Sequence, residues 1–249
     1  MKIAAIQHDI AWENPEENFA QLSPLIEKAA DQGALLIVLS ELFSTGFSMN
    51  TEHISEPPDG PSTNFLVKHA KELGVWVCGS APILSSGNDL PHNCLVLANP
   101  DGDVLKYDKK HLFTFAEEDQ HYVGGSLPLT INIEGTRCTF FVCFDLRFAP
   151  DFWDLAPTTD LFVVIANWPE PRRDHWKSLL KARAIENQSF VLGVNRIGEG
   201  DGLTYSGDSS LFNPLGEILA EAENYQTHTF LYEIEPSTVA AIRSAFPFR

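Results

Sequence analysis

The sequence has few basic residues and no long apolar run. Of its 249 residues, 17 are Lys or Arg and 34 are Asp or Glu, which gives a formal net charge of −17 at pH 7. Nucleic acids and anionic membranes bind basic surfaces, so this charge argues against either of them as a partner. No stretch of about 18 apolar residues occurs, and the sequence therefore predicts no transmembrane helix.

The chain also lacks paired cysteines and the pattern of a signal peptide. Its four cysteines, at positions 78, 94, 138 and 143, form no C-x-x-C pair, so the spacings of zinc ribbons and thioredoxin-like sites are missing. The segment from Met1 to Asp9 turns polar too soon for a signal peptide. We therefore expect reduced thiols and a cytoplasmic location.

Strand-like and helix-like patterns alternate along the whole chain. With 44% hydrophobic residues, the sequence can bury a large core, and no low-complexity linker divides it. We therefore predict a single α/β domain over residues 1–249. Tight turns are expected at residues 99–102 and 213–216, which contain Asn-Pro pairs. The main strand-like runs are residues 3–8, 35–39, 75–79, 94–98, 104–107, 129–133, 136–143, 161–166, 190–195, 209–212, 217–220 and 230–234.

Two helical segments carry specific expectations about their geometry. Apolar residues between Phe19 and Ala29 follow helical spacing, but Pro24 inside this pattern predicts a kink or a break. A second helix is expected to run through Asn187, with Asp174 as a plausible N-cap.

Three chemically active residues each follow a predicted strand. Glu41 comes after residues 35–39, Lys109 after residues 104–107, and Cys143 closes residues 139–142. Ligands of α/β sheets bind at the carboxyl ends of strands. Hydrolysis of an amide through a thioester requires a nucleophile, a base and a cation for the oxyanion. Each residue also has an ordinary alternative: a packed thiol, a helix cap or a turn lysine.

The segments around these residues resemble the three signature segments of the nitrilase superfamily, whose carbon–nitrogen hydrolases use a Glu-Lys-Cys triad. They are residues 40–43 (Ser-Glu-Leu-Phe), 107–113 (Tyr-Asp-Lys-Lys-His-Leu-Phe) and 143–148 (Cys-Phe-Asp-Leu-Arg-Phe). The resemblance extends from Ala4 to Pro247. It implies a four-layer α-β-β-α sandwich, a homodimer, and a reaction that needs neither a metal nor an organic cofactor.

The resemblance also implies a role for each residue. Glu41 would be the general base and Cys143 the nucleophile, while Lys109 and the backbone N–H of Phe144 would stabilise the oxyanion. Lys109 is chosen over Lys110 because, in the family, the lysine is followed by any one residue and then by His-Leu, as in residues 109–112.

Three further expectations concern the surroundings of this triad. Lys109 is expected to lower the pKa of the Cys143 thiol. A second glutamate, at Glu117 or, in the alternative register, Glu118, would orient Lys109 or the substrate. Asp145 and Arg147 are expected to pair and to brace the turn.

Residues 166–176 and 182–188 resemble the omega-amidase branch, whose members hydrolyse the terminal amide of 2-oxoglutaramate. Such a substrate carries a carboxylate, for which Arg172, with Arg173 as second choice, would supply a bidentate partner. Trp168 and Arg147 are further candidates for substrate contacts. Two alternatives stay open: a nitrilase or N-carbamoyl amidase that uses the same triad, and a catalytically silent binding subunit with this fold.

Overall fold

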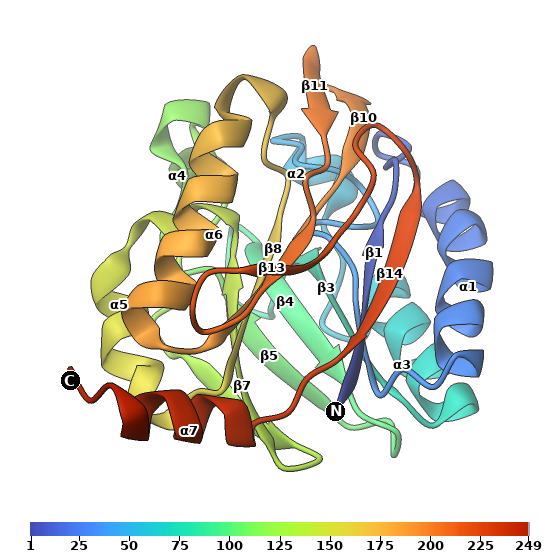
Figure 1. The fold of residues 1–249 in the computed structure, drawn as a ribbon. Coiled ribbons are helices and arrows are strands. Elements are labelled where there is room, and N and C mark those ends of the chain that lie inside the picture. The colour runs from blue at the N-terminus through green and yellow to red at the C-terminus, as the bar shows by residue number, and fades with distance from the viewer. Residues whose placement is uncertain (249) are drawn as a thin grey trace.

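In the computed structural model, which describes residues 1–248, two six-stranded sheets lie between two helical layers (Figure 1). The first sheet has the order β14-β1-β2-β3-β4-β5 and the second has the order β13-β12-β9-β8-β7-β6. The first sheet consists of β1 (Lys2–Gln7), β2 (Leu36–Val38), β3 (Trp76–Ile83), β4 (His92–Ala98), β5 (Val104–Asp108) and β14 (His228–Glu233). The second consists of β6 (Leu129–Ile133), β7 (Thr136–Val142), β8 (Leu161–Ala166), β9 (Phe190–Asn195), β12 (Ser210–Phe212) and β13 (Ile218–Glu221).

Helices cover the outer face of each sheet. On the first sheet lie α1 (Pro15–Asp31) and α3 (Pro61–Leu73), and on the second lie α5 (Ala149–Leu155) and α6 (Arg173–Asn187) (Figure 1). The shorter helices are α2 (Thr51–Ile54), α4 (Glu118–His121) and α7 (Ser237–Ala245). This arrangement confirms the predicted α-β-β-α sandwich.

Both faces of the inner strands are buried, which explains their continuous apolar sequences. In β1, Ile3 and Ala5 belong to the core between the sheets, whereas Ala4 and Ile6 pack with the helices outside. Successive side chains of a strand point to opposite faces. A strand between two apolar layers therefore needs apolar residues at every position.

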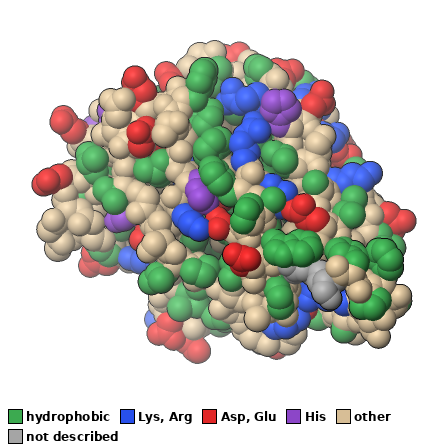
Figure 2. Space-filling model, turned by 90° about the vertical axis from the view of Figure 1, so that its left-hand side faces the viewer, with side chains coloured by type: hydrophobic (Ala, Val, Ile, Leu, Met, Phe, Trp, Pro, Cys, Tyr) green, Lys and Arg blue, Asp and Glu red, His purple; other side chains and the backbone are tan. Residues whose placement is uncertain are grey.

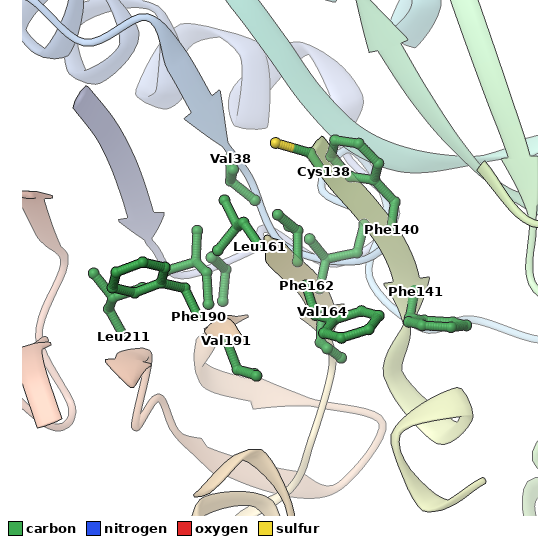
Figure 3. Packing of buried hydrophobic residues seen from close by; sticks show 14 of the residues in the cluster. Val38, Cys138, Phe140, Phe141, Leu161, Phe162, Val164, Phe190, Val191 and Leu211 are labelled. Atoms are coloured by element: carbon green, nitrogen blue, oxygen red, sulfur yellow. The ribbon is translucent and has the colours of Figure 1, made fainter. Parts of the chain in front are cut away.

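The same alternation operates in the second sheet. Cys138 and Phe140 of β7 point toward Val38 of the first sheet, and Phe141 points the opposite way (Figure 3). There the Phe141 ring packs on Phe152 of α5, with ring centroids 4.2 Å apart. The strand that ends at the predicted nucleophile is therefore anchored on both of its faces.

Of the local predictions, those of the two tight turns are confirmed and those about the two helices are not. The turns at residues 99–102 and 213–216 do connect β4 with β5 and β12 with β13. Helix α1 continues through Pro24 without the predicted break, and α6 begins at Arg173, so Asp174 lies inside its first turn and is not the N-cap. The sequence patterns did not predict the β10 (Ile197–Gly200) and β11 (Leu203–Ser206) hairpin.

The surface reflects the negative net charge. Acidic side chains are spread over the face on which α5 and α6 lie, and Lys and Arg side chains stand beside hydrophobic ones in its upper part (Figure 2). Across residues 1–248, every helix falls short of the length or the apolar character that a bilayer-spanning segment requires.

Because Pro24 lies inside α1 on its exposed side, we expect Pro24→Ala to stabilise the protein. The substitution supplies the missing N–H donor, and Pro is disfavoured by about 3 kcal/mol in a helix interior. Removing Pro also gives the unfolded chain more conformational freedom, which lowers the free energy of unfolding by up to about 1 kcal/mol. A net gain of about 2 kcal/mol should appear in urea unfolding, and the exposed control Glu27→Ala should change stability by less than about 0.5 kcal/mol. A loss of stability in Pro24→Ala would contradict this expectation.

Candidate active site

Four side chains from the two sheets meet where their strands end. Glu41 follows β2, Lys109 follows β5, Cys143 follows β7, and Asn167 follows β8. The chain thus brings the three residues predicted from the sequence to one place, together with an asparagine that the sequence patterns did not indicate. The backbone N–H of Lys109 donates to Asn93 of β4 (3.0 Å), which fixes the end of β5.

Glu41 is fully buried and held by three donors. Its Oε1 accepts hydrogen bonds from Asn93 Nδ2 (2.7 Å) and Lys109 Nζ (3.0 Å). Its Oε2 accepts one from the backbone N–H of Asn167 (2.7 Å). A carboxylate oxygen accepts about two hydrogen bonds, so Oε2 is the atom that can still receive a proton.

Lys109 is also fully buried and lies between two carboxylates. Its Nζ donates to Glu41 Oε1 (3.0 Å) and to Glu118 Oε1 (2.9 Å). Burial by itself lowers the pKa of Lys109, but the charges of Glu118 and Glu41 outweigh it and raise the pKa well above its ordinary value. The ammonium therefore stays charged, and within residues 1–248 these carboxylates take two of its three hydrogens. The Phe47 ring, which lines the pocket described below, lies against the ammonium, with its centroid 5.1 Å from Nζ.

The structure places Glu118, and not Glu117, beside Lys109. Glu118 is fully buried, accepts from Lys109, and binds the backbone N–H of Phe113 through Oε2 (2.6 Å). Glu117 is exposed and lines the mouth of the pocket. The reason is the backbone: Glu117 takes a left-handed conformation (φ 57°) between a 3₁₀ turn and α4, which directs the next residue inward.

Cys143 occupies a strained position at the start of a 3₁₀ turn. Its φ of 48° lies in the left-handed region that side chains other than glycine rarely adopt. Such strain persists where surrounding structure enforces it, and it gathers at functional sites. The turn directs the thiol away from the strand core and into the pocket that Cys143 lines.

Burial raises the pKa of the Cys143 thiol well above its ordinary value, and the neighbouring Glu41 carboxylate raises it further. Lys109 acts in the predicted, opposite direction, but its effect is the smaller one. The predicted effect of Lys109 on the thiol pKa is therefore present, but burial and Glu41 outweigh it and the net shift is upward. Such a thiol is neutral at pH 7 and needs a base to become a nucleophile.

Asp145 braces the turn, but with partners other than Arg147. It accepts hydrogen bonds from the hydroxyl of Tyr107 (2.8 Å) and from the backbone N–H groups of His111 (2.8 Å) and Val142 (3.0 Å). Burial raises the pKa of Asp145 to about 6. The predicted pair of Asp145 with Arg147 is thus absent from residues 1–248, and Asp145 instead ties the Cys143 turn to the Lys109 loop.

A cavity of about 270 Å³ opens above the thiol. Six of its sixteen lining residues are aromatic, and two arginines and two carboxylates are among the others. The lining residues are Phe47, Met49, Phe113, Phe115, Ala116, Glu117, Cys143, Phe144, Arg147, Asn167, Trp168, Pro169, Arg172, Asp201, Leu203 and Tyr205. Its volume lies just below the usual range of about 300–1,000 Å³ for drug-sized ligands, which suits a small substrate.

Two of the three predicted arginines line this cavity. The Arg147 guanidinium lies over the Trp168 ring (4.9 Å) and that of Arg172 lies over the Phe113 ring (5.3 Å). Burial and the positive charge of Arg172 lower the pKa of Arg147. Two guanidinium groups that repel each other in a half-enclosed site favour an anion between them.

Arg173 does not contribute to the cavity. Its guanidinium is bound to Asp208 (2.7 Å) and to the hydroxyl of Tyr225 (3.4 Å). Consecutive residues at a helix start point about 100° apart, given 3.6 residues per turn, so Arg172 and Arg173 cannot both face the same site. The second-choice residue, Arg173, thus lies outside the cavity lining, and Arg172 remains the first choice.

Sequence reasoning missed two other contributors to the site. Asn93 Nδ2 donates to both Glu41 and Glu118 (3.2 Å to the latter), and no local pattern marks a strand asparagine for such a role. The β10–β11 hairpin supplies Leu203 and Tyr205 to the cavity. Asn167 had a usable signal, since it is the first polar residue after a fully apolar strand.

Known proteins resemble this chain over almost its whole length. The model of the carbon-nitrogen hydrolase family matches residues 2–244. An omega-amidase of Escherichia coli K12, YafV, is 36% identical over 99% of this chain and 94% of its own length. A 2-oxoglutaramate amidase of Bacillus subtilis is 32% identical over 98% of this chain and 95% of its own.

Solved structures show the same fold. A CN-hydrolase superfamily protein of Xanthomonas campestris, with an arsenic adduct in its active site, superposes with a TM-score of 0.92 at 36% identity, covering 99% of this chain and 95% of that one. Yeast Nit3, at 23% identity and a TM-score of 0.90 over 100% of this chain and 94% of its own, shows the fold alone. The chain therefore belongs to the carbon–nitrogen hydrolase family. Within the nitrilase superfamily it is an amidohydrolase, a hydrolase of carbon–nitrogen bonds in amides.

The neighbouring glutamates give a direct test of the register of this loop. We expect Glu118→Gln to lower the free energy of unfolding by about 1.5–3 kcal/mol, because Lys109 loses a buried charged partner. Ammonia release from an amide should also fall. The exposed control Glu117→Gln should change stability by less than about 0.5 kcal/mol. Denaturant unfolding of both variants checks this. A larger loss of stability in Glu117→Gln than in Glu118→Gln would mean that Glu117 is the partner of Lys109.

Proposed function

We propose that the protein hydrolyses the terminal amide of a short 2-oxo dicarboxylic acid monoamide, such as 2-oxoglutaramate, through a thioester on Cys143. One observation carries the proposal. A single small cavity holds the thiol at its base, beside the Glu41–Lys109 pair, and has Arg147 and Arg172 in its wall. The names of the relatives from E. coli and B. subtilis support the same substrate class.

In the acylation step, Cys143 Sγ attacks the amide carbon while the thiol proton moves to Glu41 Oε2. The carbonyl oxygen becomes an oxyanion that Lys109 and the backbone N–H of Phe144 stabilise. Glu41 then returns its proton to the amide nitrogen, the carbon–nitrogen bond breaks, and ammonia leaves. The acyl group remains on sulfur as a thioester.

The second step removes the acyl group. A water molecule attacks the thioester carbon and transfers a proton to Glu41, again with Lys109 beside the oxyanion. The carbon–sulfur bond then breaks, the thiolate takes the proton from Glu41, and the free acid departs. The raised thiol pKa fits this scheme, because Cys143 must recover its proton at the end of each cycle.

The arginines would hold the far carboxylate of the substrate. A guanidinium matches a carboxylate with two parallel hydrogen bonds, and Arg147 is already stacked on Trp168, which limits its freedom. The aromatic wall excludes water from the space between this carboxylate and the thiol. An N-carbamoyl compound or a nitrile would use the same nucleophile, and these serve as comparison substrates. A homodimer and a cytoplasmic location remain predictions.

The covalent step can be tested by rapid quench and intact-mass measurement. With 2-oxoglutaramate, the wild type should gain the mass of the acyl group, and the label should map to Cys143. Glu41→Gln should form this adduct at least about 100-fold more slowly, since it has no proton acceptor. Cys143→Ala should fold, form no adduct and release no ammonia, and ammonia release near the wild-type rate would exclude Cys143 as the nucleophile.

The carboxylate contact can be tested with two amides of equal length, one with and one without a carboxylate. Arg172→Ala and Arg147→Ala should each raise KM for the carboxylate substrate about ten- to hundred-fold, the equivalent of about 1.5–3 kcal/mol. Each should change KM for the neutral amide far less. Arg173→Ala is the matched control and should leave both KM values close to wild type. An equal rise in KM for the two amides would mean that neither arginine binds the carboxylate.

A further inference from the structure

Asn167 is fixed against Glu41 by two hydrogen bonds. Its backbone N–H donates to Glu41 Oε2 (2.7 Å) and its Nδ2 donates to the Glu41 carbonyl oxygen (2.6 Å). The side chain is 4% exposed and directly follows β8. Because a carbonyl oxygen can only accept, its contact identifies the nitrogen of the amide group and therefore also the oxygen, Oδ1.

This oxygen has no hydrogen-bond partner within residues 1–248, although it is buried. Leaving a buried acceptor without a donor costs free energy, so such atoms call for a physical explanation. Asn167 lines the cavity above Cys143. Asn93, the other asparagine on Glu41, also has an unpartnered oxygen but is not among the residues that line the cavity.

We propose that Asn167 Oδ1 accepts a hydrogen bond from the –NH₂ group of the substrate amide. The inference rests on the proposed function in one respect: it takes Cys143 as the atom to which the amide carbon bonds. A carbon at Cys143 places the amide nitrogen among the neighbouring polar groups of the cavity. Among the residues that line the cavity, Asn167 offers an acceptor oxygen that no described donor occupies, and Glu41 Oε2, which binds the Asn167 backbone behind it, would supply the proton.

The contact serves the departure of ammonia. An amide nitrogen with one N–H directed at Asn167 has its orientation fixed while its lone pair develops in the tetrahedral adduct. Because the Asn167 backbone binds Glu41 Oε2, the proton donor and the acceptor that orients the nitrogen belong to one rigid unit. Asn167 would therefore contribute to specificity for primary amides.

Esters offer the discriminating comparison. An ester has an oxygen in place of the –NH₂ group, so it cannot donate to Asn167 and leaves Oδ1 unpaired. A site built to bind an N–H discriminates against an analogue that lacks it. The thioester formed on Cys143 and its hydrolysis are the same for both substrates, so the two differ in the leaving group of the acylation step.

The experiment measures kcat/KM for 2-oxoglutaramate and for the corresponding 5-methyl ester. In Asn167→Ala, the ratio of amide to ester activity should fall by about tenfold relative to wild type, which corresponds to about 1.4 kcal/mol. The control Asn93→Ala removes a donor to Glu41 without touching the cavity. It should lower both activities by the same factor and leave the ratio unchanged.

A second variant keeps the test decisive if Asn167→Ala does not fold. Asn167→Asp retains the shape and an acceptor oxygen but loses the donor to Glu41, so it should be slower on both substrates with a ratio close to wild type. An unchanged ratio in a folded Asn167→Ala, or a collapsed ratio in Asn167→Asp, would overturn the inference. A wild type that hydrolyses neither substrate would instead overturn the proposed function.

Discussion

The buried ammonium of Lys109 is the group on which the site depends. A charge removed from water costs several kcal/mol unless it is paired, and Lys109 is 0% exposed. Glu41 and Glu118 together compensate it, and Asn93 donates to both carboxylates. These three partners come from the loop after β2, from α4 and from β4. Electrostatic compensation thus holds three separate segments at fixed distances around the pocket.

Backbone strain accompanies this charge cluster. Leu42, Glu117 and Cys143 all have left-handed conformations, with φ between 43° and 57°. The first two adjoin the carboxylates that hold Lys109, and the third is the predicted nucleophile itself. Each of these residues lies next to, or is, a side chain of the site: Leu42 follows Glu41, Glu117 precedes Glu118, and Cys143 lines the pocket. The anchored sheets below, with both faces of β7 packed, provide the stability that such conformations require.

The fold was largely predictable because its strands are buried on both faces. Continuous apolar runs mark them, and a polar residue directly after such a run marks the edge at which ligands bind. Glu41 and Cys143 were found at the ends of such runs and Lys109 where a strand pattern meets a basic turn, with the family resemblance to select among neighbours. The sequence patterns did not predict the β10–β11 hairpin because its strands have partly exposed, polar sequences. The role of Asn93 was not predicted because it depends on contacts with Glu41 and Glu118, which lie 52 and 25 residues away along the chain.

The sequence patterns by themselves determined the α/β class, the strand ends that carry the predicted triad and the absence of a long apolar span, while the family resemblance implied the four layers. Only the tertiary structure decided between adjacent residues of like chemistry: Glu118 over Glu117 and Arg172 over Arg173. It also gave Asp145 its partners and raised the thiol pKa of Cys143. The physical reason is common to these cases. Apolar periodicity is a local property of the chain, whereas the direction of one side chain and its desolvation depend on the backbone angles and charges of distant segments.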